Sequence, residues 1–186
     1  MEKSSRDRLL EAGLEVLGRE GGARFSVRST EGEAGLPHGS VRHHFGGLDG
    51  LVDAMVEHLL RAEMEHAITS PRETLHDWLG PNRTRTQARY ELMTMAFRTP
   101  RLRGALAAAR ERVITDVATD SGLMHDRATV LVAALDGLVL DALLRGESDL
   151  RPGAVEMLGA QPSRGPHPSE EVTGRSGGVG STGRPS

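Results

Sequence analysis

The sequence of 186 residues predicts an all-α protein. Apolar residues recur at spacings of three and four along most of the chain, which is the periodicity of amphipathic helices. Glycine, proline and serine stand between these segments, where helices begin and end. Only 3% of the residues are aromatic, so leucine, valine, alanine and methionine have to form the core.

The composition narrows the class of protein. The chain has no cysteine, which excludes disulfides, thiolate catalysis and cysteine metal sites and favours a reducing cytoplasm. The first seven residues lack the apolar core of a secretory signal. The longest apolar run, residues 128–144, contains Asp136 and Asp141 and is short for a membrane span. We therefore expect no contact with a membrane.

Two helices are expected near the N-terminus. The first covers residues 4–18, with Ser4 placed to cap its free backbone amides. The second covers residues 27–34 and has Ser26 as its cap. Both caps use a side-chain oxygen to accept from amides that the helix itself leaves without partners.

A short turn then leads to a third helix at residues 38–45. Gly35 suits the position after a helix end, where φ is positive, and Pro37 suits the first turn of the next helix. A turn of about three or four residues between two short helices is the spacing of a helix-turn-helix, here at about residues 26–45. Net charge gives no support for a nucleic-acid partner, since residues 1–66 hold 8 Lys and Arg against 12 Asp and Glu.

The rest of the chain divides into a helical part and a tail. Residues 159–186 contain 7 Gly, 4 Pro and 5 Ser, too few apolar groups to offset the entropy of ordering. We expect an N-terminal domain at 1–66, a second helical domain at 67–151, and a disordered tail at 152–186. Further helices are expected at residues 48–65, 70–79, 84–98, 102–118 and 125–145.

Residues 34–45, Ala-Gly-Leu-Pro-His-Gly-Ser-Val-Arg-His-His-Phe, followed by Leu51, resemble the DNA-binding motif of the tetracycline-repressor (TetR) family of bacterial regulators. Ser26-Val27-Arg28 is similar to the start of that family's second helix, and Gly21 to the glycine after its first. Three later segments resemble the regulatory and dimer helices: residues 88–92, 106–113 and 134–146. The resemblance covers nearly all of the chain before the tail.

The resemblance implies a three-helix DNA-binding domain, a helical ligand-binding and dimerising domain, and release from operator DNA when a small molecule binds. The sequence departs from the family pattern at Thr30 and Glu31, where an aliphatic residue and then alanine are usual. A charged Glu31 facing the recognition helix would be costly to bury unpaired. Replacing Thr30 by isoleucine and Glu31 by alanine is therefore expected to raise the melting temperature. Leu48 replaces a common lysine, and Arg42 a common tyrosine.

The third helix has the residue types that a recognition helix needs. Small residues at its start let the backbone enter the major groove, and polar donors can line its exposed face. Arg42 can pair with guanine or with a phosphate, while the histidines and Arg28 suit phosphates. The expected DNA-binding residues are Arg28, His38, Gly39, Ser40, Arg42, His43 and His44.

A metal site or an enzyme is the competing interpretation of these side chains. The histidines have no clear i, i+4 pair on one helix face and no cysteines beside them. The sequence contains no glycine-rich phosphate loop and no Gly-x-Ser-x-Gly. We therefore expect no metal, no cofactor and no catalysis.

The second half of the chain contains candidates for two further surfaces. Methionines and aromatic residues adapt to varied apolar ligands, although the same residues are often plain core. The expected ligand-binding residues are Trp78, Met93, Met95 and Phe97. In residues 128–144, 13 of 17 residues are Ala, Val or Leu, and a helix apolar on every side is buried on every side. The expected homodimer interface is Leu131, Leu135, Leu138, Val139 and Ala142.

Two functions remain open from the sequence alone. The first is a homodimeric transcriptional regulator, with a repressor released from its operator by a small apolar ligand as the specific form. The alternative is a dimeric helical protein that binds a small molecule and has a degraded DNA-binding domain. Thr30 and Glu31 are the residues that favour this alternative.

Overall fold

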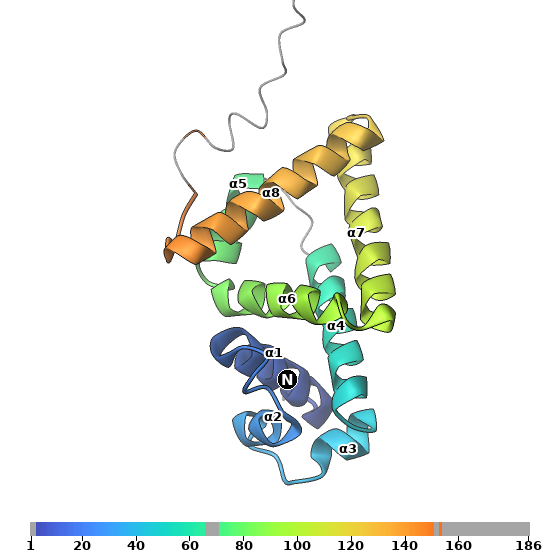
Figure 1. Ribbon diagram of the computed structural model, residues 1–186, viewed down its shortest axis with the longest axis vertical. Helices are drawn as coiled ribbons and strands as arrows, with labels where there is room; N and C mark the ends of the chain where they lie inside the picture. Colours follow the sequence, from blue (N-terminus) through green and yellow to red (C-terminus); the bar gives the residue numbers. More distant parts are fainter. Residues whose placement is uncertain (1–2, 66–70, 151–152, 154–186) are drawn as a thin grey trace, which may run out of the picture.

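The computed structural model describes residues 3–65, 71–150 and 153 (Figure 1). These residues form eight helices and no strand, so the all-α prediction is confirmed. The predicted disordered tail, residues 152–186, lies outside the described residues except for Gly153. The helices are α1 (Ser5–Glu20), α2 (Val27–Ala34), α3 (Ser40–Phe45), α4 (Leu48–Glu65), α5 (Pro71–Leu79), α6 (Arg83–Ala96), α7 (Pro100–Ser121) and α8 (His125–Arg145).

The helix ends follow the local signals in the sequence. α2, α4 and α8 begin and end at the predicted residues, and the other ends differ by at most three residues. Ser4 and Ser26 both accept a backbone amide as helix caps. Gly35 and Gly146 both follow a helix end in the left-handed conformation that glycine tolerates.

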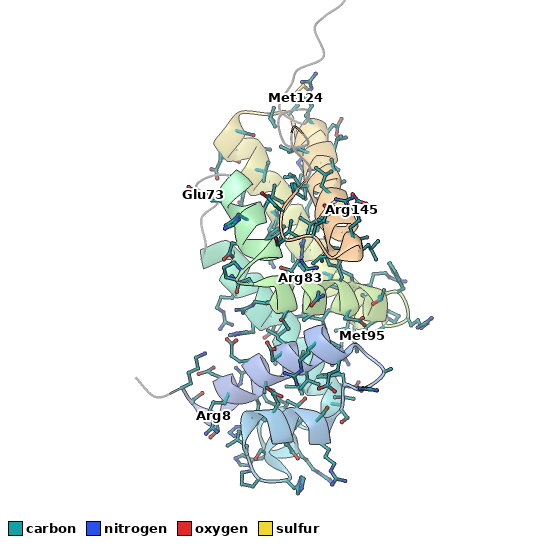
Figure 2. The ribbon with its side chains drawn as sticks, turned by 90° about the vertical axis from the view of Figure 1, so that its left-hand side faces the viewer. Arg8, Glu73, Arg83, Met95, Met124 and Arg145 are labelled. Atoms are coloured by element: carbon teal, nitrogen blue, oxygen red, sulfur yellow. The ribbon has the colours of Figure 1, made fainter. Side chains whose placement is uncertain are left out.

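The molecule is elongated, with α1, α2 and α3 gathered at one end (Figure 1). α4 runs from this three-helix unit into the rest of the protein. The second half of the molecule consists of α5, α6, α7 and α8. Figure 2 shows Arg8 of the three-helix unit and Met124, just before α8, at opposite ends of the molecule. No helix in the described part is long and apolar enough to cross a membrane.

The two halves meet where α1 packs on α6. A Cβ added at Gly18 would lie 2.0 Å from the backbone oxygen of Thr84, so only glycine allows this close approach. The backbone N–H of Gly22 also donates to Glu91 of α6 across 3.2 Å. Arg101 at the start of α7 forms an ion pair with Asp53 of α4 at 2.7 Å. The three-helix unit is therefore held to the second half through both α1 and α4.

The helix α8 is buried on one face only, and two of the five predicted dimer residues are fully buried on that face. Val139 and Ala142 are fully buried within the same chain and pack near Leu135. They were predicted to meet a second copy. The apolar composition of α8 was evident from the sequence, but which face points inward depends on α5, α6 and α7, which no local pattern reveals.

The opposite face of α8 carries the exposed apolar side chains. Val130 is 68% exposed, Leu140 41% and Leu144 79%. Ala133 and Gly137 are also exposed. These five residues recur at alternating spacings of three and four, which is the pattern of a seam between two packed helices. We call them the α8 outer stripe.

Candidate nucleic-acid interface

The helix-turn-helix is built from α2, a turn and α3. Ser26 and Ser29 form a reciprocal capping box at the start of α2. Gly35 ends α2 with φ 61°. The next helix begins at Ser40 rather than at the predicted His38, because Gly39 has φ 94° and cannot join a right-handed helix. Pro37 therefore belongs to the turn, where its carbonyl accepts from the Ser40 hydroxyl at 2.6 Å.

Glu31 of α2 holds the start of α3 in place. Its Oε1 accepts hydrogen bonds from the backbone N–H groups of Gly39 and Val41, each across 3.0 Å. Its Oε2 lies 3.3 Å from Nδ1 of His38. The side chain is only 2% exposed. Glu31 is therefore buried as expected, but its carboxylate is fully paired. From α2 it caps the start of α3, because it accepts hydrogen bonds from the free backbone amides there.

The electrostatics of this site favour the charged carboxylate. The hydrogen bond from the Val41 amide is the main cause that holds the pKa of Glu31 below its usual range. Burial acts in the opposite direction, and the contacts with His38 and Gly39 add to the lowering. The expectation that Glu31 weakens this domain is therefore wrong, because its charge is matched by donors from α3.

Thr30, beside Glu31, is buried without compensation. It is fully buried, and its hydroxyl has no hydrogen-bond partner. A buried hydroxyl without a partner destabilises the folded state. Of the two departures from the family pattern in α2, only Thr30 leaves a polar atom unsatisfied.

Three arginines of α1 fasten this helix to α2 and α3. Nη2 of Arg8 donates to the carbonyl of Ala34 at the end of α2, across 2.6 Å. The guanidinium of Arg6 lies 5.2 Å from the centre of the Phe45 ring, at the end of α3. Arg19 pairs with Glu33 of α2 at 2.9 Å. These contacts make α1 a brace for both helices of the motif.

The predicted DNA-binding residues lie on these two helices and on the turn between them, at the free end of the molecule (Figure 1). All except Ser40, which is half-buried, are exposed. Val41 is fully buried on the core side of α3, and Phe45 is half-buried. The rings of His43 and His44 meet edge to face at 4.8 Å. Within the described residues, no three His, Asp or Glu side chains gather as a metal ion would require.

The sequence predicts the exposed residues of this surface but not the residue that orders it. Glu31 was noticed only as a misplaced charge. The available signal was an acidic residue eight and ten positions before the free amides of Gly39 and Val41. A carboxylate facing the start of the next helix is a favourable arrangement, because helix N-termini attract negative charge.

The four predicted ligand residues do not come together. Trp78 packs beside the cluster of Leu75, Leu79, Val139 and Ala142 in the second half of the chain. Met95 packs instead against the core that includes α1 and α4, and Phe97 is 75% exposed. Met93 is half-buried. Trp78 lies on α5, Met93 and Met95 lie on α6, and Phe97 follows the end of α6, so the four residues share no common face.

A half-buried polar cluster lies beside Trp78. The guanidinium of Arg89 is 5.0 Å from the centre of the Trp78 ring, and it pairs with Asp136 of α8 at 3.1 Å. Arg110 of α7 also pairs with Asp136. The hydroxyl of Tyr90 donates to the backbone oxygen of Asp136 across 2.8 Å. These residues, together called the Asp136 cluster, join four helices around one aromatic ring.

A braced helix-turn-helix at one end and a separate helical part with its own core define a helix-turn-helix regulator with a helical C-terminal domain. Residues 49–161 match the family model described as "Tetracyclin repressor-like, C-terminal domain". The chain is 28% identical over 167 residues to the HTH-type transcriptional regulator BetI of Paraburkholderia xenovorans (strain LB400). That alignment covers 79% of this chain and 86% of the relative.

Two solved structures extend the similarity over most of the fold. A TetR-family member from Streptomyces coelicolor A3 is 31% identical with a TM-score of 0.70, over 84% of this chain and 97% of that one. The multidrug binding protein EbrR complexed with imidazole is 31% identical with a TM-score of 0.66, over 88% and 99%. This chain belongs to the TetR family of transcriptional regulators, and the resemblance predicted from residues 34–45 is confirmed.

Proposed function

We propose that this protein binds a specific operator through α3 and acts as a repressor that a small molecule releases. The observation that carries the proposal is the buried, fully paired Glu31, which fixes the start of α3 while the side chains around it stay exposed. A recognition helix has to be held rigidly to bring its side chains to base edges. The alternative of a degraded DNA-binding domain loses its main support, since Glu31 stabilises the motif.

The expected contacts divide by chemistry. Arg42 is exposed on α3 and suits a guanine edge or a phosphate. Arg28 on α2 and the histidines of α3 suit phosphates, which set the position of the protein on the duplex. Gly39 and Ser40 let the backbone approach the groove.

Gel shifts at a stated salt concentration test this function, with DNA from immediately upstream of the gene as the probe. Arg42→Ala is expected to weaken specific binding by about 1–3 kcal/mol, the usual value of a good base contact. Arg112→Ala is the matched control, because Arg112 is an exposed arginine on α7. Equal binding by both variants and the parent chain would remove Arg42 from the interface. A folded protein that binds no fragment specifically would refute the function.

We infer that the effector binds the second half of the chain beside Trp78. The apolar cluster around Leu75 and Val139 and the adjacent Asp136 cluster offer both apolar and polar partners. Similarity to a multidrug binding protein supports a small-molecule ligand. Such a ligand would perturb α6, which packs on α1, and so reach the DNA-binding helices.

The single tryptophan makes this second proposal measurable. Compounds that co-purify with the protein, identified by mass spectrometry, are to be titrated back while the emission of Trp78 is recorded. Binding is expected to change the emission and to release the operator probe over the same concentration range. A compound that releases DNA without affecting Trp78 would place the effector site elsewhere.

A homodimer formed through the α8 outer stripe completes the proposal. Two copies related by a two-fold axis would cover the exposed Val130, Leu140 and Leu144. The pair would also present two copies of α3 to two half-sites of the operator.

A further inference from the structure

His38 lies between a buried carboxylate and solvent. Its Nδ1 is 3.3 Å from Oε2 of Glu31. Glu31 is almost entirely enclosed, whereas His38 is 80% exposed. One ring nitrogen is therefore committed to the protein and the rest of the ring is open to whatever approaches the turn before α3.

The hydrogen-bond partner of Nδ1 determines whether Nε2, the outer ring nitrogen of His38, can donate a hydrogen bond. A carboxylate only accepts hydrogen bonds, so the hydrogen of the neutral ring has to stay on Nδ1, facing Glu31. Nε2 is then a pure acceptor. A DNA phosphate oxygen is also only an acceptor, so the neutral ring of His38 cannot donate to it. Donation to both partners at once requires the imidazolium, in which both nitrogens carry a hydrogen.

We propose that Glu31 is a positioning residue that makes operator binding take up one proton at His38. The inference rests on the proposed function, because it requires α3 and its turn to contact DNA. Protein with a neutral His38 binds the operator less well, since a lone pair then faces the phosphate. The imidazolium gains a charge-assisted hydrogen bond on each side.

The test has to separate His38 from the other charged and titratable groups near this turn. Arg28 on α2 and Arg42 on α3 stay charged over the whole working range. Arg8 of α1 is bonded to the end of α2. His43 and His44 are two further histidines, on α3. The relevant measurement is therefore the difference between the parent chain and a His38 variant.

The experiment measures the dissociation constant of full-length protein and the upstream DNA probe from pH 6 to 8.5 at fixed salt. For the parent chain, the logarithm of the dissociation constant is expected to rise with pH. One linked proton corresponds to at most about a tenfold change per pH unit. His38→Gln should lower that slope by up to one unit, and calorimetry in two buffers should count correspondingly fewer protons taken up on binding.

The Glu31→Gln variant separates the protonation of His38 from the hydrogen bonds by which residue 31 supports the start of α3. The glutamine carbonyl can still accept from Gly39 and Val41, while its amide donates to Nδ1 of His38. That change would move the ring hydrogen to Nε2, which can then donate to phosphate without a charge. Binding should persist, with the same reduced slope as in His38→Gln. His125→Gln is the control, because its pair with Glu111, at 3.1 Å, lies far from α3.

The outcomes distinguish this inference from the proposed function. A parent chain that binds no specific DNA at any pH refutes the function and the inference together. Specific binding whose slope is the same in the parent chain and in His38→Gln overturns the inference alone. A folded Glu31→Gln protein that keeps the full slope also overturns it. If Glu31→Gln does not fold, as judged by circular dichroism, the His38→Gln slope and proton count decide.

Discussion

At the residue scale, the adjacent positions 30 and 31 show that burial alone does not decide the effect of a polar side chain. Both side chains are buried. The Glu31 carboxylate accepts two backbone hydrogen bonds and contacts His38, whereas the hydroxyl of Thr30 has no hydrogen-bond partner. Two adjacent buried polar residues therefore have opposite effects, because Glu31 stabilises the folded state and Thr30 destabilises it. Opposite responses to substitution are expected.

Thr30→Val is expected to stabilise the protein. The substitution keeps the branched shape and removes a buried hydroxyl that has no partner. The gain is about 1 kcal/mol in the free energy of unfolding, which is roughly 2–4 °C in melting temperature for a chain of this size. Thermal denaturation followed by circular dichroism measures it. Thr30→Ser, which keeps the hydroxyl and loses the methyl group, should lower the melting temperature.

Glu31→Ala is expected to do the reverse and to lower the melting temperature by several degrees at pH 7. The pKa of Glu31 is lowered in the folded state, so its stabilisation is complete above the ordinary value of 4.5. That stabilisation is lost as the pH falls through the lowered value. The gap between parent and variant should therefore narrow in acid. Glu57→Ala on the exposed side of α4 is the control, and a gap that stays constant with pH would contradict the role assigned to the carboxylate.

At the element scale, the helices were predictable because their signals are local. Ser26 caps α2 and Gly35 ends it within a few residues of where the pattern changes. Contacts between elements were not predictable in the same way. The bonds from Gly39 and Val41 to Glu31 cross a turn, and the phase of α8 depends on helices that are distant in sequence. The recognition surface stays a prediction, and the contacts that support it and the free face of α8 required three-dimensional placement.

A single substitution at Gly18 should push α1 away from α6. A Cβ there would meet the backbone oxygen of Thr84, which cannot swing away as a flexible side chain would. Gly18→Ala is expected to force α1 from α6 and to lower the free energy of unfolding by about 1–3 kcal/mol.

Gly32→Ala is the matched control for this prediction, because a Cβ at Gly32 would meet no atom within 4 Å. Alanine within the exposed part of α2 should stabilise the protein by about 0.5–1 kcal/mol. Chemical denaturation of both variants provides the comparison. Equal stability of Gly18→Ala and the parent chain would mean that the α1–α6 contact yields without loss.

At the scale of the whole molecule, the α8 outer stripe and the predicted DNA-binding residues occupy separate parts of the described surface. The α8 outer stripe lies on the last helix, far from α3 (Figure 1). Separation of the two surfaces would let a dimer form without covering the predicted DNA-binding residues. It also means that a dimer variant leaves each copy of α3 intact, so the loss of DNA affinity would come from the loss of the second half-site alone.

Leu140→Glu combined with Leu144→Glu is expected to convert a dimer into a monomer of 20.0 kDa. Two charges in an apolar seam would face each other across the two-fold axis, where burial of unpaired carboxylates is unfavourable. Light scattering measures the mass. Phe97→Glu is the control, because Phe97 is as exposed as Leu144 but follows α6. The monomer should retain its helical content and lose most of its affinity for an operator with two half-sites. A variant that keeps the dimeric mass would move the interface to another face.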